Sequence, residues 1–218
     1  MARTKEDWTI KKGSSIVEEG VALNLTKRFL FDGANLLDVG SGNGLFLRQA
    51  KNFSPGLNAF GLDTENFIAS DIRKKVSFET LKAEDAWPFE EGKFQVITAW
   101  NVVEHLDNPS LFAKRAAKAL VPRGHILLSM PNIFNLLNRF YFLRTGDMYR
   151  FKSSNSHITI ITKLVFKKVF QDFEVVSIGF SGVEPPFEFL RKISFIKKVL
   201  PESELFGKTI YYVLRKKN

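Results

Sequence analysis

Residues 35–44 read NLLDVGSGNG: a short apolar run, 35–39, ends in glycines at positions 40, 42 and 44. Residues 45–51 then have the spacing of apolar side chains that is typical of a helix. Glycines at such a turn let the backbone approach a ligand closely, and the first N–H groups of the following helix can bind that ligand. The stretch therefore predicts a strand, a ligand-binding turn and a helix.

The same alternation of strand and helix extends in both directions from this turn. An amphipathic pattern predicts a first helix over 15–30, and Asn108 followed by Pro109 predicts the N-cap and first turn of a helix that ends at Leu120. Further helices are expected at 65–72 and from Thr162 to Gln171, and further strands at 57–62, 76–80, 94–100, 125–130, 173–180 and 208–214. Strands and helices that alternate at this spacing form a parallel sheet covered on both faces. We predict an α/β fold with a doubly wound, seven-stranded, mostly parallel sheet in the order 3-2-1-4-5-7-6, in which only 208–214 is antiparallel.

Length and composition favour a single globular domain over residues 1–218, since 44% of the chain is hydrophobic and 25% is charged. The chain contains no cysteine, which excludes disulfides, thiolate nucleophiles and cysteine-ligated metal centres. The first fifteen residues are polar, and no apolar run approaches the roughly 18 to 20 residues of a membrane-spanning helix. We therefore expect a soluble, cytoplasmic protein.

The net charge of +9 is concentrated in the last third of the chain. Residues 139–218 hold 15 Lys/Arg against 7 Asp/Glu, whereas residues 1–138 hold 17 against 16. Residues 185–201 form a basic segment whose apolar side chains are spaced as in an amphipathic helix, and prolines stand at both ends of this segment. Such a surface attracts phosphates of nucleic acids, of nucleotide-linked substrates or of anionic membranes, and an ordinary solvated surface is the alternative.

Two carboxylates near the glycine turn are further evidence for a ligand-binding site there. Asp38 precedes the first glycine by two residues, where it can hold the cationic amino group of a methionine moiety. Asp63 ends the second predicted strand and is placed to accept hydrogen bonds from both hydroxyls of an unphosphorylated ribose. The alternative is that each carboxylate only caps the turn that follows it. The dinucleotide pattern G-x-G-x-x-G is not met, because Leu45 stands where its third glycine belongs.

Four segments, LLDVGSGNG, AFGLDTEN, AWPFEEGKFQVITAWNVVEHLDNP and VPRGHILLSMPN, together resemble class I S-adenosylmethionine-dependent methyltransferases. The resemblance covers roughly residues 30–180 and is closest to the small-molecule branch that includes the ubiquinone- and menaquinone-type enzymes. Residues 132–180 are also similar to members linked to surface-polysaccharide pathways. The resemblance implies a Rossmann-like methyltransferase fold, S-adenosyl-L-methionine as methyl donor and S-adenosyl-L-homocysteine as product.

Carried over by position, the resemblance implies a set of cofactor-binding residues. They are Asp38, Gly40, Ser41, Gly42 and Asn43 at the methionine end, Asp63 and Thr64 at the ribose, and Trp100 and Asn101 beside the sulfonium. The family often has an acidic residue in the loop before Trp-Pro-Phe that meets the adenine amino group. Ala83 stands at that position here, so Glu84 and Asp85, which follow it, are the candidates.

Methyl transfer needs an acceptor lone pair aligned behind the activated methyl carbon, and a hydroxyl acceptor also benefits from a base. The candidates for that base are His105, Glu104 and His157. The three histidines of the chain have no metal-ligand spacing, so we expect no metal. Residues 132–160 fall where this family inserts a cover over the substrate, although core packing would explain their apolar side chains equally well.

These features favour in-line methylation of a small molecule or of a lipid- or sugar-linked acceptor. An RNA or protein methyltransferase that uses the basic C-terminal face is one alternative, and an NAD(P)-dependent oxidoreductase is another. A protein that kept the fold and lost turnover is the third. Peripheral contact with a membrane and the oligomeric state are left open by the sequence.

Overall fold

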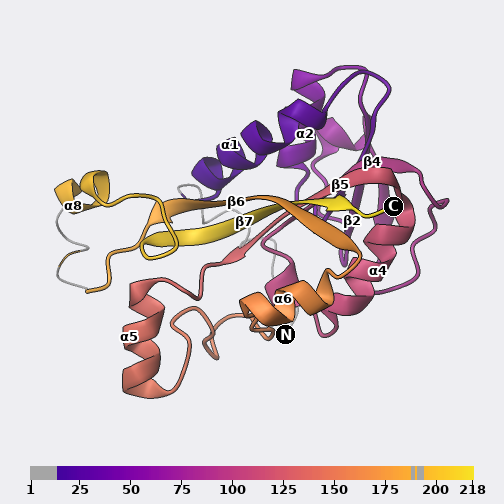
Figure 1. Cartoon of the computed structure of the whole chain (residues 1–218). Helices are drawn as coiled ribbons and strands as arrows, with labels where there is room; N and C mark the ends of the chain where they lie inside the picture. Colours follow the sequence, from indigo (N-terminus) through magenta and orange to yellow (C-terminus); the bar gives the residue numbers. More distant parts are fainter. Residues whose placement is uncertain (1–13, 188–189, 191–193) are drawn as a thin grey trace.

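A computed structural model describes residues 14–187, 190 and 194–218 (Figure 1). Its seven strands form one sheet in the order β3-β2-β1-β4-β5-β7-β6. The strands are β1 (Asn35–Val39), β2 (Asn58–Asp63), β3 (Ser77–Thr80), β4 (Phe94–Trp100), β5 (Leu120–Pro131), β6 (Phe173–Val183) and β7 (Gly207–Lys216). Strand β7 is antiparallel to both of its neighbours, and the other pairs are parallel. The predicted order and the single reversed strand are confirmed.

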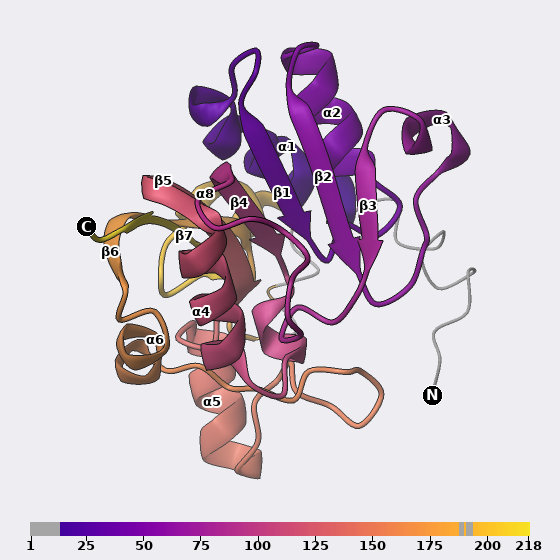
Figure 2. The same cartoon turned by 90° about the vertical axis from the view of Figure 1, so that its right-hand side faces the viewer.

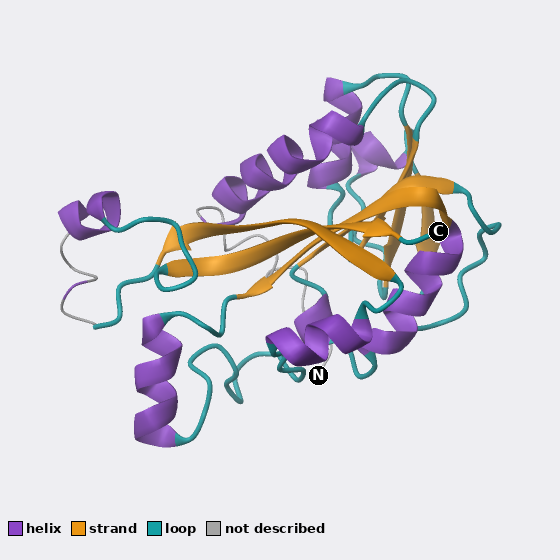
Figure 3. Ribbon diagram, viewed as in Figure 1, coloured by secondary structure: helices purple, strands orange, loops and turns teal. Residues whose placement is uncertain are grey.

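Helices cover both faces of the sheet (Figure 3). They are α1 (Ser14–Thr26), η2 (Lys27–Phe29), α2 (Leu45–Phe53), α3 (Ser70–Arg73), η3 (Val103–His105), α4 (Pro109–Ala119), α5 (Leu136–Thr145), α6 (Lys163–Val169) and α8 (Ser194–Val199). Helices α1 and α2 lie on one face of the sheet, and α4 and α6 lie on the other (Figure 1). The chain is therefore wound on both sides of the sheet, as predicted.

The central strand β1 shows why the sequence folds in this way. Successive side chains of a strand point to opposite faces, and Leu36 and Leu37 accordingly lie in the two separate hydrophobic clusters of the protein. Both side chains are completely buried, because each face of the sheet carries a layer of helices. Strand β1 pairs with β4 through Leu37 and Ile97, which also places the carboxyl ends of these two strands side by side.

The structure confirms the residues that were predicted to begin α4 and α6. Asn108 caps α4, its Oδ1 accepting a hydrogen bond from the Leu111 N–H at 3.2 Å, and Pro109 begins the helix. Thr162 caps α6 in the same manner, with Val165 N as donor at 3.3 Å, although that helix ends at Val169, before the predicted Gln171.

The helix predicted at 65–72 is largely wrong. Only Ser70–Arg73 is helical, and this short α3 lies beside the β3 edge of the sheet (Figure 2). The Ala69 N–H donates to the Asn43 carbonyl at 3.1 Å, and Ile68 is buried against Gly44, so tertiary contacts hold 65–69 in an extended path over the glycine turn. The first helix is close to its prediction of 15–30, with α1 ending at Thr26 and η2 continuing to Phe29.

Two helices lie away from the layered body of the protein. Helices α5 and α8 occur beyond the region where α1, α2 and α4 cover the sheet, near the end of the β6–β7 pair (Figure 1). Helix α5 belongs to the segment 132–160 that was predicted to cover a substrate. Helix α8 belongs to the basic segment 185–201, of which residues 188–189 and 191–193 lie outside the described part of the chain.

Candidate active site at the carboxyl ends of the parallel strands

The glycine turn after β1 requires glycine for two reasons. Gly40, Gly42 and Gly44 have positive φ angles of 72°, 52° and 79°, in the left-handed region that other residues rarely adopt. A Cβ atom on Gly40 would also lie 2.4 Å from Cγ2 of Val102. The turn therefore packs directly against the chain that follows β4, and the ends of β1 and β4 form one continuous surface.

The side chains within this turn have different environments. Ser41 is buried, and its Oγ has no hydrogen-bond partner among the described residues. The Asn43 Oδ1 accepts from the Leu45 N–H at 3.0 Å at the start of α2. The Ser41 Oγ faces Gly61 of β2, where an added Cβ would lie 2.9 Å from it, so a contact between Ser41 and the cofactor stays a prediction.

Asp63 connects the end of β2 to the glycine turn. One carboxylate oxygen accepts from the Gly42 N–H at 2.8 Å, and the other accepts from the Thr64 N–H at 2.7 Å. The alternative function, capping of the backbone, is therefore present in the structure. Each carboxylate oxygen can accept a second hydrogen bond, so the ribose contact stays a prediction that is compatible with the geometry.

Asp38 is completely buried at the end of β1, and its Oδ1 accepts a hydrogen bond from Thr98 Oγ1 at 2.7 Å. Burial raises the pKa of this carboxyl from 3.8 to about 7; the hydrogen bond from Thr98 acts in the opposite direction, and the nearby charge of Asp63 raises the pKa further. A buried carboxyl that is costly to ionise would be stabilised as an anion by a cationic partner. This environment fits the predicted contact with an amino group.

The end of β4 carries a strained residue. Asn101 has a positive φ of 53°, and its N–H donates to both the carbonyl and Oγ of Ser129 at 3.1 and 3.0 Å. The preceding Trp100 packs its ring against Phe46 of α2, with 5.8 Å between centroids, so its side chain belongs to the α2 face of the sheet. A non-glycine residue with positive φ at a strand end is a frequent feature of functional sites.

Glu84 and Asp85, the candidates for the adenine contact, make local hydrogen bonds. Glu84 Oε1 accepts from the Asn108 N–H at 2.7 Å, and Asp85 Oδ2 accepts from the Lys82 N–H at 3.0 Å. Glu84 thereby ties its loop to the start of α4, and Asp85 closes a turn. The adenine contact stays a prediction.

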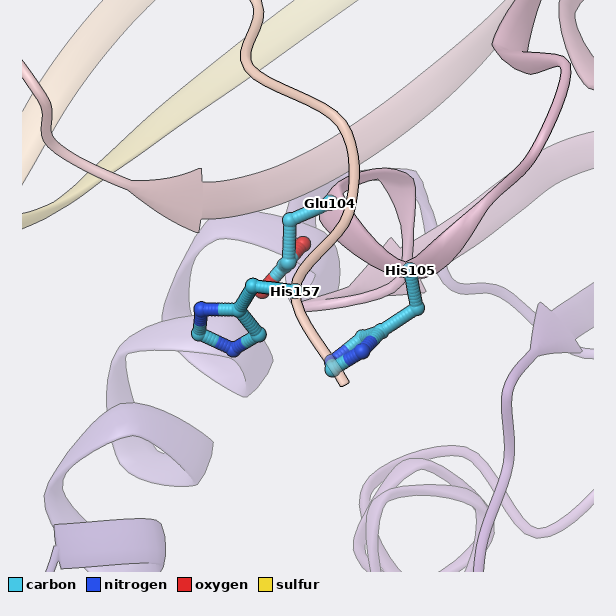
Figure 4. Close-up of side chains that lie close together, drawn as sticks. All are labelled: Glu104, His105 and His157. Carbon is cyan, nitrogen blue, oxygen red and sulfur yellow. The ribbon is translucent and has the colours of Figure 1, made fainter. Parts of the chain in front are cut away.

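The three residues predicted to assist the acceptor, Glu104, His105 and His157, lie together in space (Figure 4). Their ligand atoms all lie within 4.8 Å of one another, and the two imidazole rings are 4.8 Å apart between centroids. Glu104 is buried, and both histidines are partly buried. We call this group the Glu-His-His cluster. Glu104 and His105 belong to η3, which directly follows Val102, the residue that contacts Gly40.

A loop that returns from α5 brings His157 to the cluster (Figure 4). The carbonyl of Glu104 accepts from the N–H groups of Ile158 and Thr159 at 2.9 and 3.1 Å. The hydroxyl of Thr159 donates to the carbonyl of Leu106. Backbone pairing of this kind docks residues 157–159 on η3, so the cluster joins segments that are about fifty residues apart in the sequence.

The hydrogen bonds of the two rings differ in what they say about the tautomers. Nδ1 of His157 lies 2.8 Å from the Arg150 carbonyl, which has no proton to donate, so this nitrogen carries the proton and Nε2 carries the lone pair when the ring is neutral. Nδ1 of His105 lies 2.9 Å from the Ser156 carbonyl and 3.0 Å from the Ser156 hydroxyl, and because the hydroxyl can donate, these contacts fit either tautomer of His105.

The same donor set would also suit a metal ion. A carboxylate and two neutral imidazole nitrogens are ligands that zinc and related divalent ions accept. Spacing along the chain gave no sign of this arrangement, because the loop after α5 supplies His157 from far away in the sequence. The spacing of the histidines along the chain therefore does not exclude a metal site at the cluster. The expectation that no metal binds stays a prediction.

Sequence reasoning missed three residues that shape the site: Thr98, Arg150 and Ser156. Thr98 had a signal, since it is a polar residue in the middle of the apolar strand 94–100. Arg150 and Ser156 had none, because they contact the histidines from a loop far away in the sequence from His105, partly through backbone carbonyls, which every residue possesses.

Comparison with known proteins places this arrangement in a family. Residues 15–177 match the sequence profile of a family described as methyltransferase domain. The match extends over well more than half of the chain and places it with methyltransferases rather than with NAD(P)-dependent oxidoreductases.

Curated relatives match over part of their length. A tRNA U34 carboxymethyltransferase of Campylobacter curvus is 29% identical over 136 residues, which cover 53% of this chain and 45% of the relative. A ubiquinone biosynthesis O-methyltransferase of Psychrobacter cryohalolentis is 24% identical over 155 residues, which cover 65% of this chain and 59% of the relative. The chain spans about half the length of the curated relatives that it matches.

Solved structures share the fold over nearly the whole chain. An S-adenosylmethionine-dependent methyltransferase of Archaeoglobus fulgidus has a TM-score of 0.66 at 18% identity and covers 96% of each chain. A phosphoethanolamine N-methyltransferase of Haemonchus contortus, solved with S-adenosylmethionine, has a TM-score of 0.60 at 16% identity and covers 91% of this chain and 53% of that one. By its family match this chain belongs to the methyltransferase domain family, and it shares its fold with solved S-adenosylmethionine-dependent methyltransferases.

Proposed function

We propose that this chain methylates a hydroxyl group on a small molecule or on a lipid- or sugar-linked acceptor. The observation that carries the proposal is the Glu-His-His cluster, because it brings two imidazoles and a buried carboxylate together, two of them on the chain that follows the contact of Val102 with Gly40. A hydroxyl is a weak nucleophile while it keeps its proton, and a positioned histidine is the usual side chain that removes such a proton at neutral pH.

When bound, S-adenosylmethionine supplies a methyl carbon that accepts an electron pair from the acceptor oxygen while the carbon–sulfur bond breaks and leaves a neutral thioether. The residues of this chain do the rest. Asp38, Ser41 and Asp63 hold the cofactor at the ends of β1 and β2. Nε2 of His105 or His157 takes the acceptor proton, and the buried Glu104 carboxylate stabilises the imidazolium that results.

Helix α5 favours an acceptor with an apolar part. The loop that carries His157 follows this helix, whose outward side chains Phe142 and Leu143 are 48% and 80% exposed. Arg144 adds a positive charge beside them. This combination suits a lipid- or nucleotide-linked molecule better than a small polar metabolite. Among the described residues, no helix is both long enough and apolar enough to cross a membrane.

The test is transfer of a labelled methyl group from S-adenosylmethionine to fractionated lipids, sugar conjugates, phenolic quinone precursors and RNA, each offered separately. The variants His105→Asn and His157→Asn keep an N–H donor near the Nδ1 position and lose the basic Nε2. We expect each to reduce the rate about 10²- to 10⁴-fold if that ring is the base, with little change in cofactor affinity.

The matched control is His125→Asn, because His125, in the middle of β5, packs on Phe29 of η2 and takes no part in the cluster. Full activity in both cluster variants would refute the assignment of a histidine base. Transfer to RNA alone would refute the proposed acceptor class.

A second candidate, RNA methylation, has its own support. One relative is named as a tRNA enzyme, and Arg48, Lys51 and Lys75 line a surface groove of about 620 Å³ beside α2 and α3. Cations in such a groove attract a phosphate backbone. This groove lies on the cofactor half of the chain and outside the basic C-terminal third from which the sequence suggested nucleic-acid binding. The RNA arm of the transfer assay decides between the two candidates.

A further inference from the structure

An ion pair joins the loop between α5 and α6 to the residue that follows β6. Nη2 of Arg150 lies 2.7 Å from Oε1 of Glu184, which directly follows β6. The two side chains are only 24% and 11% exposed. Of the ion pairs between described residues, this pair has the least exposed partners.

The main chain of Arg150 orients the ring of His157. Its carbonyl oxygen accepts from His157 Nδ1 at 2.8 Å and from Asn155 Nδ2 at 2.7 Å. Asn155 Oδ1 in turn accepts from the His157 N–H at 3.2 Å. One residue thus binds the sheet through its side chain and determines the tautomer of a histidine through its backbone.

Both sides of the ion pair are held by buried asparagines. Asn138 Oδ1 accepts from the Tyr149 N–H at 3.1 Å, which holds the residue before Arg150. Asn135 Nδ2 donates to Glu184 Oε2 at 3.4 Å, and its own Oδ1 accepts from Asn138 Nδ2 at 2.9 Å. Asn135 and Asn138 are almost completely buried. The position of the Arg150 carbonyl is therefore tied to the sheet by a connected set of hydrogen bonds.

We infer that the Arg150–Glu184 ion pair positions His157 for proton transfer. The inference rests on the proposed function, because it assumes that His157 takes part in the reaction. Both members of the pair are positioning residues that act through the Arg150 carbonyl. Without the pair, the loop can move relative to η3, the carbonyl no longer selects the Nδ1–H form, and the lone pair is shared between the two ring nitrogens.

The decisive variant is Glu184→Gln, which removes the charge with little change in size. Long-range ¹H–¹⁵N correlation spectra of the ring nitrogens, assigned by comparison with His157→Asn, report the tautomer directly. We expect a single Nδ1–H form in the wild-type protein and a mixture in the variant. We also expect kcat to fall about tenfold through misplacement of the base, with the Kd for S-adenosylmethionine unchanged.

The control is Glu174→Gln at the opposite end of the same strand, β6. Glu174 pairs with Arg215 of β7, at the end of β6 that lies away from Glu184. We expect this variant to keep the wild-type tautomer and kcat. If Glu184→Gln does not fold, Arg150→Met removes the pair from the loop side, and the same two changes are expected of it.

A double-mutant cycle separates positioning from a general loss of structure. In a His157→Asn background, Glu184→Gln is expected to cause no further loss of kcat, since the residue through which it acts is already missing. An equal tenfold loss in that background, or an unchanged tautomer in the single variant, would overturn the inference. A fully active His157→Asn variant would also overturn the inference, whereas full activity in both His105→Asn and His157→Asn would overturn the proposed function.

Discussion

The variant Asp38→Asn is expected to stabilise the cofactor-free protein at high pH while it weakens cofactor binding. The pKa of Asp38 is raised from 3.8 to about 7, chiefly by burial. A difference of about three units corresponds to about 4 kcal/mol between the two protonation states, as an upper limit. Asparagine carries no charge and keeps an oxygen that can accept the hydrogen bond from Thr98.

The sign of the effect follows from the two pKa values. Below pH 3.8 the carboxyl is neutral in the folded and unfolded chains, so Asp38 has no ionisation cost. Between pH 3.8 and about 7 the unfolded chain is ionised while the folded chain keeps its proton, so stability is progressively lost over this range, and the loss is complete above about pH 7. The advantage of Asp38→Asn in the free energy of unfolding should therefore grow from nothing near pH 4 to at most about 4 kcal/mol at pH 8.

Urea denaturation of both proteins at pH 4, 6 and 8 without cofactor measures this difference. Thr98→Val gives a second check, because it removes the hydrogen bond that opposes the rise in pKa and should move the transition to higher pH. A constant difference between wild type and Asp38→Asn across the pH range would refute the reasoning.

Cofactor binding supplies an independent measurement on the same group. If the amino group of the methionine moiety pairs with Asp38, binding ionises the carboxyl and releases about 0.9 proton at pH 6 but only about 0.1 proton at pH 8. Calorimetry in two buffers of different ionisation enthalpy counts these protons. Asp38→Asn should release none and bind the cofactor more weakly.

Three further outcomes are expected. Gly40→Ala should lower the free energy of unfolding by about 2 to 4 kcal/mol, because the residue has a positive φ and its Cβ would meet Val102; thermal melting at an unchanged temperature would contradict this. Chelation with EDTA should leave the methylation rate unchanged if the Glu-His-His cluster works as a base, and a loss that added zinc or magnesium restores would show that the cluster holds a metal instead. Leu143→Ser on α5 should raise the KM for a lipid-linked acceptor several-fold and leave the KM for S-adenosylmethionine unchanged, whereas Leu164→Ser, at another exposed leucine, on α6, should change neither.

The parts of the protein that could be predicted from the sequence are those that depend on neighbouring residues. The turn after β1 was predictable because its glycines adopt positive φ locally, and α4 was predictable because Asn108 and Pro109 act within one helical turn. The helix at 65–72 was wrong because Ile68 packs on Gly44, a contact that no local pattern contains. The meeting of His105 with His157 was beyond prediction for the same reason, since it depends on backbone pairing across about fifty residues.

Helix α5 is fastened to the sheet at only one of its ends. Its first turn carries the buried Asn138, whereas Phe142 and Leu143 in its later turns face outward. Mutations in those later turns should therefore cost little folding energy. Selection can then alter the outer half of the helix, and with it the choice of acceptor, while the cofactor site and the base remain unchanged. Such a division lets a lineage of methyltransferases diversify in substrate range without rebuilding its catalytic centre.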